Sequence, residues 1–201
     1  KTTARRNAGF FNGEKKTMDY GLFTGVSALI GVLCNFIRIG EWKARIETRM
    51  THIEGDLRKT DAKIDELNKS VNRLNFEIMA KTIYGEARGE TREGQIAVAC
   101  VIFNRFRSGK WFAAKTLAGV CLKPLQFSCW NKSDPNSQIL ANLPYSAYSR
   151  YFDVIKEAEK GDITGGATHY CTYAALPHTK WAEGKEPCFE CGNHVFFKDI
   201  D

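Results

Sequence analysis

The pattern of apolar and polar positions is clearest between residues 41 and 78. Apolar residues recur there at steps that alternate between four and three, and only Thr60 interrupts them. This is a heptad seam, and its second half pairs branched residues with leucines, which favours a parallel two-stranded coiled coil. The alternative is one long amphipathic helix packed on its own domain. We therefore expect a homodimer through residues 41–78, with a seam of Ile46, Met50, Ile53, Leu57, Ile64, Leu67, Val71, Leu74 and Ile78.

An uncharged apolar stretch precedes the seam. No charged residue lies between Asp19 and Arg38, and this length just reaches the ~18 residues of a membrane-spanning helix. Glycine, serine, threonine and asparagine dilute its leucines, so the signal is weak. We predict a transmembrane or signal-anchor helix over residues 20–38, with a buried helix of a soluble protein as the alternative. Lysine and arginine flank it on both sides, so its orientation stays open.

Residues 1–19 are basic and polar without a clear period, which predicts a flexible N-terminal segment with Met18 as a candidate start. The formal net charge of the chain is +6. Such a charge suits an anionic envelope polymer, a membrane surface or nucleic acid. No stripe of lysine and arginine interleaved with aromatics is present, so we do not expect nucleic acid as a partner.

The pattern changes at residue 79. Residues 79–201 contain short helical stretches, scattered aromatics and most of the glycines and prolines, over a length that suits one small domain. No strong alternating strand run appears, so we expect mainly helix. The predicted fold class is thus mainly α, with a compact domain preceded by a long coiled-coil helix and an N-terminal apolar helix.

The stretch YGEARGETREGQIAV, residues 84–98, contains three glutamates between two helical patterns. Thr91 is a plausible N-cap for the second helix, and Glu93 in its first turn favours the helix dipole. Glu90 fits a solvated loop. Glu86 lies at the C-terminal end of the first helix, where a carboxylate is disfavoured and the protonated form is favoured. A general acid needs that form, so Glu86 is the candidate acid.

Four ordered motifs between residues 80 and 198 resemble the cell wall hydrolase family of spore cortex-lytic (SleB-like) enzymes, which also occurs in bacteriophage lysis proteins. They are IYGEARGETREGQIAVACVIFNRF, LAGVCLKPLQFSCWN, GGATHYCTY with a following proline and Trp181, and GNHVFF. The resemblance implies a compact, lysozyme-like catalytic domain over 79–201, with no cofactor and no metal. It places the family's acid on Glu86 and the protein in the bacterial envelope. Together with the anchor predicted at residues 20–38, we expect a membrane-anchored protein, bacterial or phage-encoded, whose catalytic domain faces peptidoglycan.

By resemblance the reaction is cleavage of the β-1,4 bond between N-acetylmuramic acid and N-acetylglucosamine by a lytic transglycosylase with a single glutamate. A hydrolytic muramidase is the alternative, and it needs a second carboxylate about 5 to 9 Å away. Glu90, Glu93 and Asp134 are the local candidates. An alternative of another class is a catalytically silent binding protein of the envelope or virion.

Six further residues are candidate substrate contacts. Three form the family's QFS element, two lie in the THY motif, and one is a tryptophan able to stack on a sugar face. Core packing and structural hydrogen bonding are the competing explanations for them. The candidates are Gln126, Phe127, Ser128, His169, Tyr170 and Trp181.

The chain contains seven cysteines, whose pairing the sequence leaves open. Cys188, Cys191 and His194 have the spacing of three zinc ligands, and His178 or Cys171 would supply a fourth. Only one C-x-x-C is present, and the family resemblance implies a different role for the GNH motif. A structural zinc site and a local disulfide are therefore the less favoured interpretations.

Overall fold

The computed structural model describes residues 20–110 and 112–200, with side chains from residue 25 onward. The predicted segment 1–19, with Met18, lies outside the described residues. The chain divides into two units, Lys1–Ala62 and Lys63–Asp201, which we describe separately.

The helices are α1 (Tyr20–Ala87), α2 (Arg92–Ser108), α3 (Leu117–Cys121), α4 (Pro135–Ala141), α5 (Tyr145–Tyr148) and α6 (Tyr151–Lys160), with 3-10 turns η1 (Ser128–Trp130), η2 (Leu176–His178) and η3 (Lys180–Ala182). The strands are β1 (His169–Thr172), β2 (Phe189–Cys191) and β3 (His194–Phe197).

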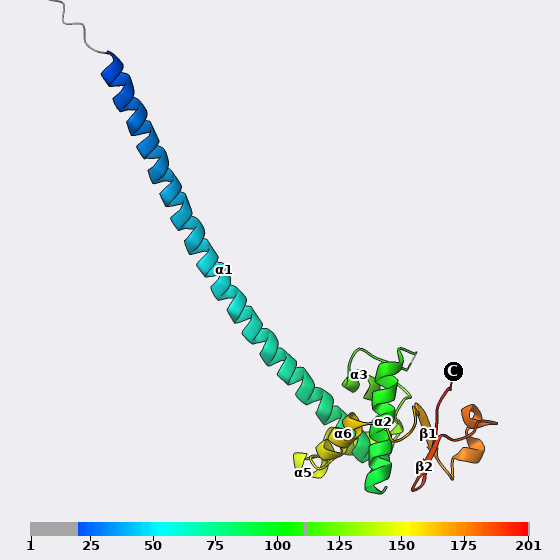
Figure 1. Ribbon diagram of the computed structural model, residues 1–201. Helices are drawn as coiled ribbons and strands as arrows, with labels where there is room; N and C mark the ends of the chain where they lie inside the picture. The colour runs from blue at the N-terminus through cyan, green and yellow to red at the C-terminus, as the bar shows by residue number, and fades with distance from the viewer. Residues whose placement is uncertain (1–19, 111, 201) are drawn as a thin grey trace, which may run out of the picture. The chain divides into compact units, whose positions relative to one another are not determined.

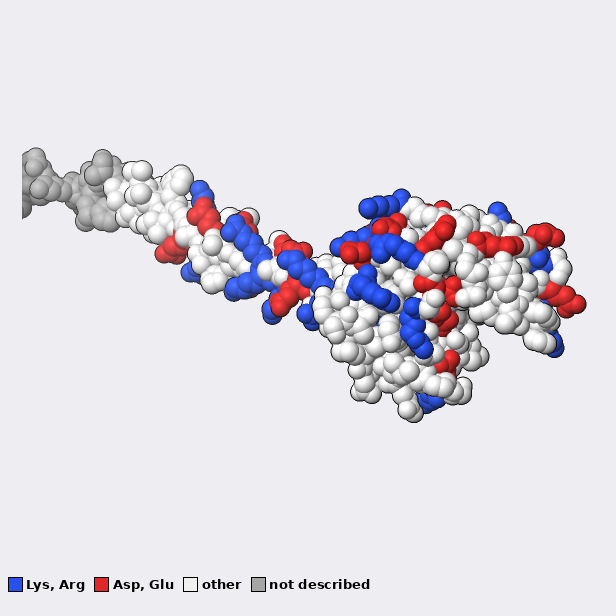
Figure 2. Space-filling model, turned by 90° about the horizontal axis from the view of Figure 1, so that it is seen from below, with Lys and Arg blue, Asp and Glu red and all other residues white. Residues whose placement is uncertain are grey.

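The described part of the first unit is helix α1 alone. The predicted apolar helix and the predicted coiled coil are segments of this one helix, with no break between residues 38 and 41. Its apolar side chains are exposed, as at Leu33, Phe36 and Trp42, and few charged side chains cover the beginning of the described helix (Figure 2). By length and composition, α1 is the one helix in the described part of the chain that is apolar enough to cross a membrane.

The seam residues of α1 are also exposed. In the first unit Met50, Ile53 and Leu57 are each more than half exposed, and in the second unit Leu67 is 64% exposed. Burial begins only near residue 76, and Met79 is fully buried. Within the second unit the seam therefore does not pack on its own domain over residues 64–74.

The core of the second unit forms around the last turns of α1. Met79, Ala80 and Ile83 pack in one apolar cluster with side chains from α2 and α6, two helices that lie beside each other (Figure 1). The contributions of α2 include Ala97, Val98, Val101 and Ile102, and those of α6 include Tyr151, Val154, Ile155 and Ala158. The helix that ends at the candidate acid is thus anchored by buried apolar surface.

Helix α2 begins where the sequence predicts. The hydroxyl of Thr91 accepts a hydrogen bond from the amide of Gly94, and Glu93 lies in the first turn, so both predictions are confirmed. The helix ends at Ser108, and the C-cap residue Gly109 has φ +65°. Glycine adopts this left-handed conformation without the strain that a side chain introduces.

A small antiparallel sheet was not predicted. Its strand order is β1–β3–β2, with His169 opposite Phe197 and Cys191 opposite His194. The strands contain only three or four residues, and all four positions of β3 are buried, so no alternation is visible in the sequence. The expectation of a mainly helical fold is nevertheless confirmed.

All seven cysteines are free thiols. Cys100, Cys121 and Cys129 are buried. Burial raises the pKa of Cys100 to about 11 and that of Cys121 to about 12. These thiols therefore act as small apolar core residues rather than as nucleophiles.

Candidate active site

The candidate acid Glu86 lies in the last turn of α1, next to Gly85. A Cβ at Gly85 would lie 2.6 Å from the Cβ of Cys129, so glycine allows η1 to approach the helix closely. That approach brings the amide of Cys129 and the hydroxyl of Ser128 to Glu86. The side chain is half-buried.

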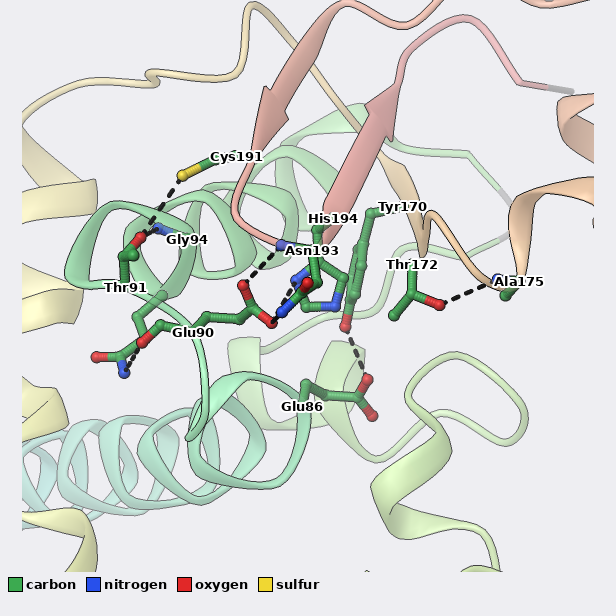
Figure 3. Close-up of polar contacts among 11 residues, drawn as sticks. Glu86, Glu90, Thr91, Gly94, Tyr170, Thr172, Ala175, Cys191, Asn193 and His194 are labelled. Atoms are coloured by element: carbon green, nitrogen blue, oxygen red, sulfur yellow. Dashed lines mark hydrogen bonds and ion pairs between the residues drawn. The ribbon is translucent and has the colours of Figure 1, made fainter.

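Three donors hold the carboxylate of Glu86. Its Oε1 accepts hydrogen bonds from the backbone N–H of Cys129 at 2.9 Å and from the hydroxyl of Ser128 at 3.3 Å. Its Oε2 accepts one from the hydroxyl of Tyr170 at 2.9 Å (Figure 3). The three donors come from η1 and β1, so the carboxylate joins the helical part of the domain to the sheet.

Glu86 opens into a cavity of about 630 Å³. Five of the six predicted substrate contacts line it with Glu86: Gln126, Ser128, His169, Tyr170 and Trp181. Phe127 is not among the lining residues. It is 2% exposed and packs in the core, with the Arg105 guanidinium 4.6 Å from its ring centroid.

Sequence reasoning missed other lining residues, above all Arg105, Leu125 and His194. Leu125 is 83% exposed and has φ +65°, a strained conformation for a leucine and one that often occurs at functional sites. Arg105 was not predicted, although a charged residue on the apolar face of α2 was a usable signal. His194 was weighed only as a zinc ligand.

Arg105 links three parts of the site. It is 4% exposed, and its Nε and Nη1 donate to the carbonyls of Thr168 and Gln126 at 2.6 and 2.9 Å. Burial lowers the pKa of this guanidinium, while Tyr170 and Glu86 offset part of that effect. The side chain ties α2 to the strand and loop that carry the donors to Glu86.

Tyr170 gives a direct test of how Glu86 is held. Its pKa is raised well above the usual value, first by burial of the hydroxyl and then by the negative charge of Glu86, so it remains a donor. We expect Tyr170→Phe to keep the fold and to lower kcat about tenfold, because a hydrogen bond to a charged group contributes about 1.5–3 kcal/mol. Rates of glycan cleavage check this, with Tyr173→Phe at an exposed tyrosine outside the cavity lining as control. An unchanged rate would contradict it.

His169 makes the stability of the domain depend on pH. Burial, followed by the charges of Arg105 and Lys110, lowers its pKa to about 4, against about 6.5 in an unfolded chain. As pH falls from about 6.5 to about 4, the unfolded state binds a proton that the folded state does not, so stability decreases. We expect His169→Gln to flatten the fall of Tm over this range. The same change at exposed His178 should leave the pH profile of Tm intact.

The other carboxylates near the motif have different partners. Glu90 accepts hydrogen bonds from the backbone N–H and the side chain of Asn193. Asp134 is the N-cap of α4, and its carboxylate accepts from the amide of Asn136. Glu93 is exposed in the first turn of α2. None of the three lines the cavity around Glu86 among the residues that the structure describes.

The geometry does not fit the zinc interpretation. Cys188 Sγ lies 3.5 Å from the carbonyl of Phe196, Cys191 Sγ lies 3.7 Å from the hydroxyl of Thr91, and His194 Nδ1 faces Glu90. The three side chains therefore have separate partners. Across residues 20–110 and 112–200, no three metal-binding side chains are grouped for a metal ion.

The chain is similar to several characterised proteins. It is 35% identical over 143 residues to the spore cortex-lytic enzyme of Bacillus subtilis (strain 168), which covers 69% of this chain but only 42% of that protein. Among solved structures it is similar to the catalytic domain of the Bacillus cereus SleB protein, with 30% identity and a TM-score of 0.52, covering 63% of this chain and 91% of that one. It is also similar to the catalytic domain of the germination-specific lytic transglycosylase SleB from Bacillus anthracis, with 29% identity and a TM-score of 0.51. This match covers 62% of this chain and 94% of that one.

These similarities confirm the expected SleB-like domain after the long helix. The chain spans less than half of the length of the curated relatives it matches. The family model for Cell Wall Hydrolase matches residues 89–197. The chain therefore belongs to the cell wall hydrolase family.

Proposed function

We propose that this protein cleaves the β-1,4 bond between N-acetylmuramic acid and N-acetylglucosamine in peptidoglycan, as a lytic transglycosylase. One observation carries the choice of mechanism: among the described residues that line the cavity, Glu86 is the only carboxylate. A transglycosylase needs one such group, whereas a muramidase needs a partner carboxylate about 5 to 9 Å away. The similarity to a lytic transglycosylase from Bacillus anthracis supports the same choice.

The hydrogen bonds of Glu86 assign its proton in this mechanism. The backbone N–H of Cys129 can only donate, so Oε1 stays an acceptor. The transferable proton then belongs on Oε2, beside the Tyr170 hydroxyl, which can accept from the acid and donate to the carboxylate. Proton transfer to the glycosidic oxygen lets the bond from this oxygen to muramic C1 break, so that N-acetylglucosamine leaves with a 4-hydroxyl and an oxocarbenium-like centre develops at C1. The carboxylate then takes the proton of the muramic 6-hydroxyl, and that oxygen closes a 1,6-anhydro ring.

Mass spectrometry of products from purified peptidoglycan tests the reaction. Soluble fragments that end in 1,6-anhydromuramic acid are the expected result. Reducing muramic ends would establish the muramidase alternative and reopen the search for a second carboxylate. No soluble fragments would favour the silent binding protein, and cleaved stem peptides would contradict glycosidic cleavage altogether.

The proposal includes a membrane anchor at residues 20–38 and a role in cell wall lysis at the envelope, as an endolysin. Exposed apolar side chains such as Leu29, Leu33 and Phe36 support the anchor, because water is an unfavourable environment for such a surface. Carbonate extraction of membranes should leave the full-length protein in the pellet. Complete release into the soluble fraction before lysis would contradict an anchor.

We further propose that the seam of residues 41–78 forms a homodimer. Leu67→Lys is expected to shift the full-length protein in detergent from dimer to monomer, because it places a charge on an apolar contact that a second copy would bury. Asn68→Lys, beside the seam and also exposed, is the matched control and should stay dimeric. Sedimentation equilibrium checks this, and a monomeric wild-type protein would contradict the dimer.

A further inference from the structure

The buried histidine of β3 has no role in the mechanism above. His194 is 5% exposed, and it is the one buried side chain in the described part of the chain whose nitrogen, Nδ1, has no hydrogen-bond partner. Its ring packs edge-on against Tyr170 at 5.1 Å between centroids, and the residue lines the cavity. His194 therefore lies beside the tyrosine that holds Glu86.

Glu90 faces the buried nitrogen. Its Oε1 lies 4.0 Å from Nδ1 of His194, and both side chains are almost fully buried. Asn193 fixes the carboxylate, since its backbone N–H donates to Oε2 at 3.0 Å and its side-chain amide donates to Oε1 at 3.1 Å (Figure 3). Burial raises the pKa of Glu90, but these two hydrogen bonds and the electrostatic effect of His194 together lower it. The group is thus an ionised acceptor.

Gly192 makes this contact possible. Its φ is +59°, and a Cβ at this position would overlap Oε2 of Glu90. Two motifs distant in sequence, EARGE (residues 86–90) and GNH (residues 192–194), therefore meet at one contact. The second glutamate of EARGE contacts the GNH turn and does not line the cavity.

We propose that Glu90 is a positioning residue that keeps His194 in the neutral tautomer with its hydrogen on Nδ1, so that Nε2 accepts a hydrogen bond from the sugar substrate in the cavity. This proposal rests on the proposed function for the identity of the substrate. Sugar hydroxyls and acetamido N–H groups are the donors that such an acceptor recognises.

Electrostatics favours this tautomer. An N–H dipole directed at a carboxylate 4.0 Å away is attracted, whereas a ring lone pair in the same place is repelled. Burial lowers the pKa of His194, and the charges of Glu90 and Glu86 only partly offset that effect. The ring is therefore neutral near pH 7, and the carboxylate selects which nitrogen carries the hydrogen.

Nitrogen-15 spectroscopy of the histidine rings of the full-length protein reads the tautomer directly. The signals of His194 are assigned by their loss in His194→Asn. We expect hydrogen on Nδ1 in the wild type and on Nε2 in Glu90→Gln, because the amide of glutamine can donate to Nδ1. Glu93→Gln, an identical change at an exposed glutamate three residues farther along the chain, should leave the tautomer unchanged. The same tautomer in wild type and Glu90→Gln would overturn the proposal.

Activity supplies a second readout. His194→Asn keeps an N–H near Glu90 and lacks Nε2, whereas His194→Gln places an amide oxygen near the position of Nε2. We expect Glu90→Gln and His194→Asn each to lower kcat/KM about tenfold, the double variant to be no worse than either, and His194→Gln to recover most of the loss. Full activity in Glu90→Gln, or additive losses in the double variant, would overturn the proposal.

The two readouts separate this proposal from the proposed function. A wild type that releases no glycan fragments, with the expected tautomer change intact, would refute the proposed reaction and leave the Glu90–His194 pair standing. If Glu90→Gln does not fold, two measurements still test the proposal: the tautomer of His194 in the wild type, and kcat/KM of His194→Asn compared with that of His194→Gln. Hydrogen on Nε2 in the wild type, or equal activity of these two variants, would refute it.

Discussion

Glu86→Gln is expected to lower the release of soluble glycan fragments about 10²- to 10⁴-fold, the usual contribution of a positioned general acid. Glutamine has nearly the shape of glutamate and still accepts from the backbone N–H of Cys129, while the Tyr170 hydroxyl can accept from its amide. The hydrogen-bonded frame is kept and only the transferable proton is lost. Quantification of 1,6-anhydromuramic ends by mass spectrometry measures the effect.

The matched control is Glu93→Gln, which makes the same chemical change in the same motif at an exposed position outside the cavity lining. It should retain wild-type activity, and both variants should bind peptidoglycan as the wild type does. Full activity in Glu86→Gln would remove Glu86 from the mechanism. Loss of activity in both variants would indicate that the negative charge of the motif matters rather than the acid.

Arg105→Ala is expected to produce the largest loss of stability, about 3 kcal/mol or more. The change leaves the half-buried carbonyls of Thr168 and Gln126 without their donor, at about 1–3 kcal/mol each, and it opens a void beside Phe127. The segments that carry Ser128 and Tyr170 lose their common anchor, so activity should fall as well. Thermal unfolding should show Tm lowered by about 10 °C for a domain of this size.

Arg107→Ala is the control for this experiment. It removes the same side chain from the same helix, but Arg107 is exposed, and exposed substitutions usually change stability by less than about 0.5 kcal/mol. The Tm of Arg105→Lys should lie between those of the wild type and Arg105→Ala, because lysine keeps the positive charge but cannot donate to both carbonyls with the geometry of a guanidinium. Equal Tm values for the two alanine variants would contradict the role assigned to Arg105.

Hydrophobic periodicity and capping patterns predicted those elements whose determinants lie within one short stretch of chain. The heptad spacing identified a helix over residues 41–78 that the structure contains within α1, and the N-cap at Thr91 follows from one side chain and one amide three residues later. The same rules failed for the sheet, because β1 and β2 pair with β3 through backbone groups that leave no pattern in three or four residues.

One part of the candidate site was predictable from the sequence: a residue with acid chemistry that also lies at the end of a helix. Glu86 was singled out because it ends a helix, and five of the predicted contacts line its cavity. Phe127 was grouped with its neighbours in the QFS element, yet it precedes η1 and its side chain enters the core, whereas Ser128 begins η1 and reaches Glu86. Arg105 and His194 were missed as lining residues because their roles depend on contacts with distant segments.

By itself, the sequence determined the elements whose information is local: the long helix with its seam, the capped start of α2, and the glutamate at a helix end. Tertiary structure alone decided which polar groups meet. Ser128 and Tyr170 lie 42 and 84 residues from Glu86, and Asn193 lies 103 residues from Glu90. Such hydrogen bonds depend on ångström distances set by packing of the whole core, and no periodicity of the chain encodes those distances.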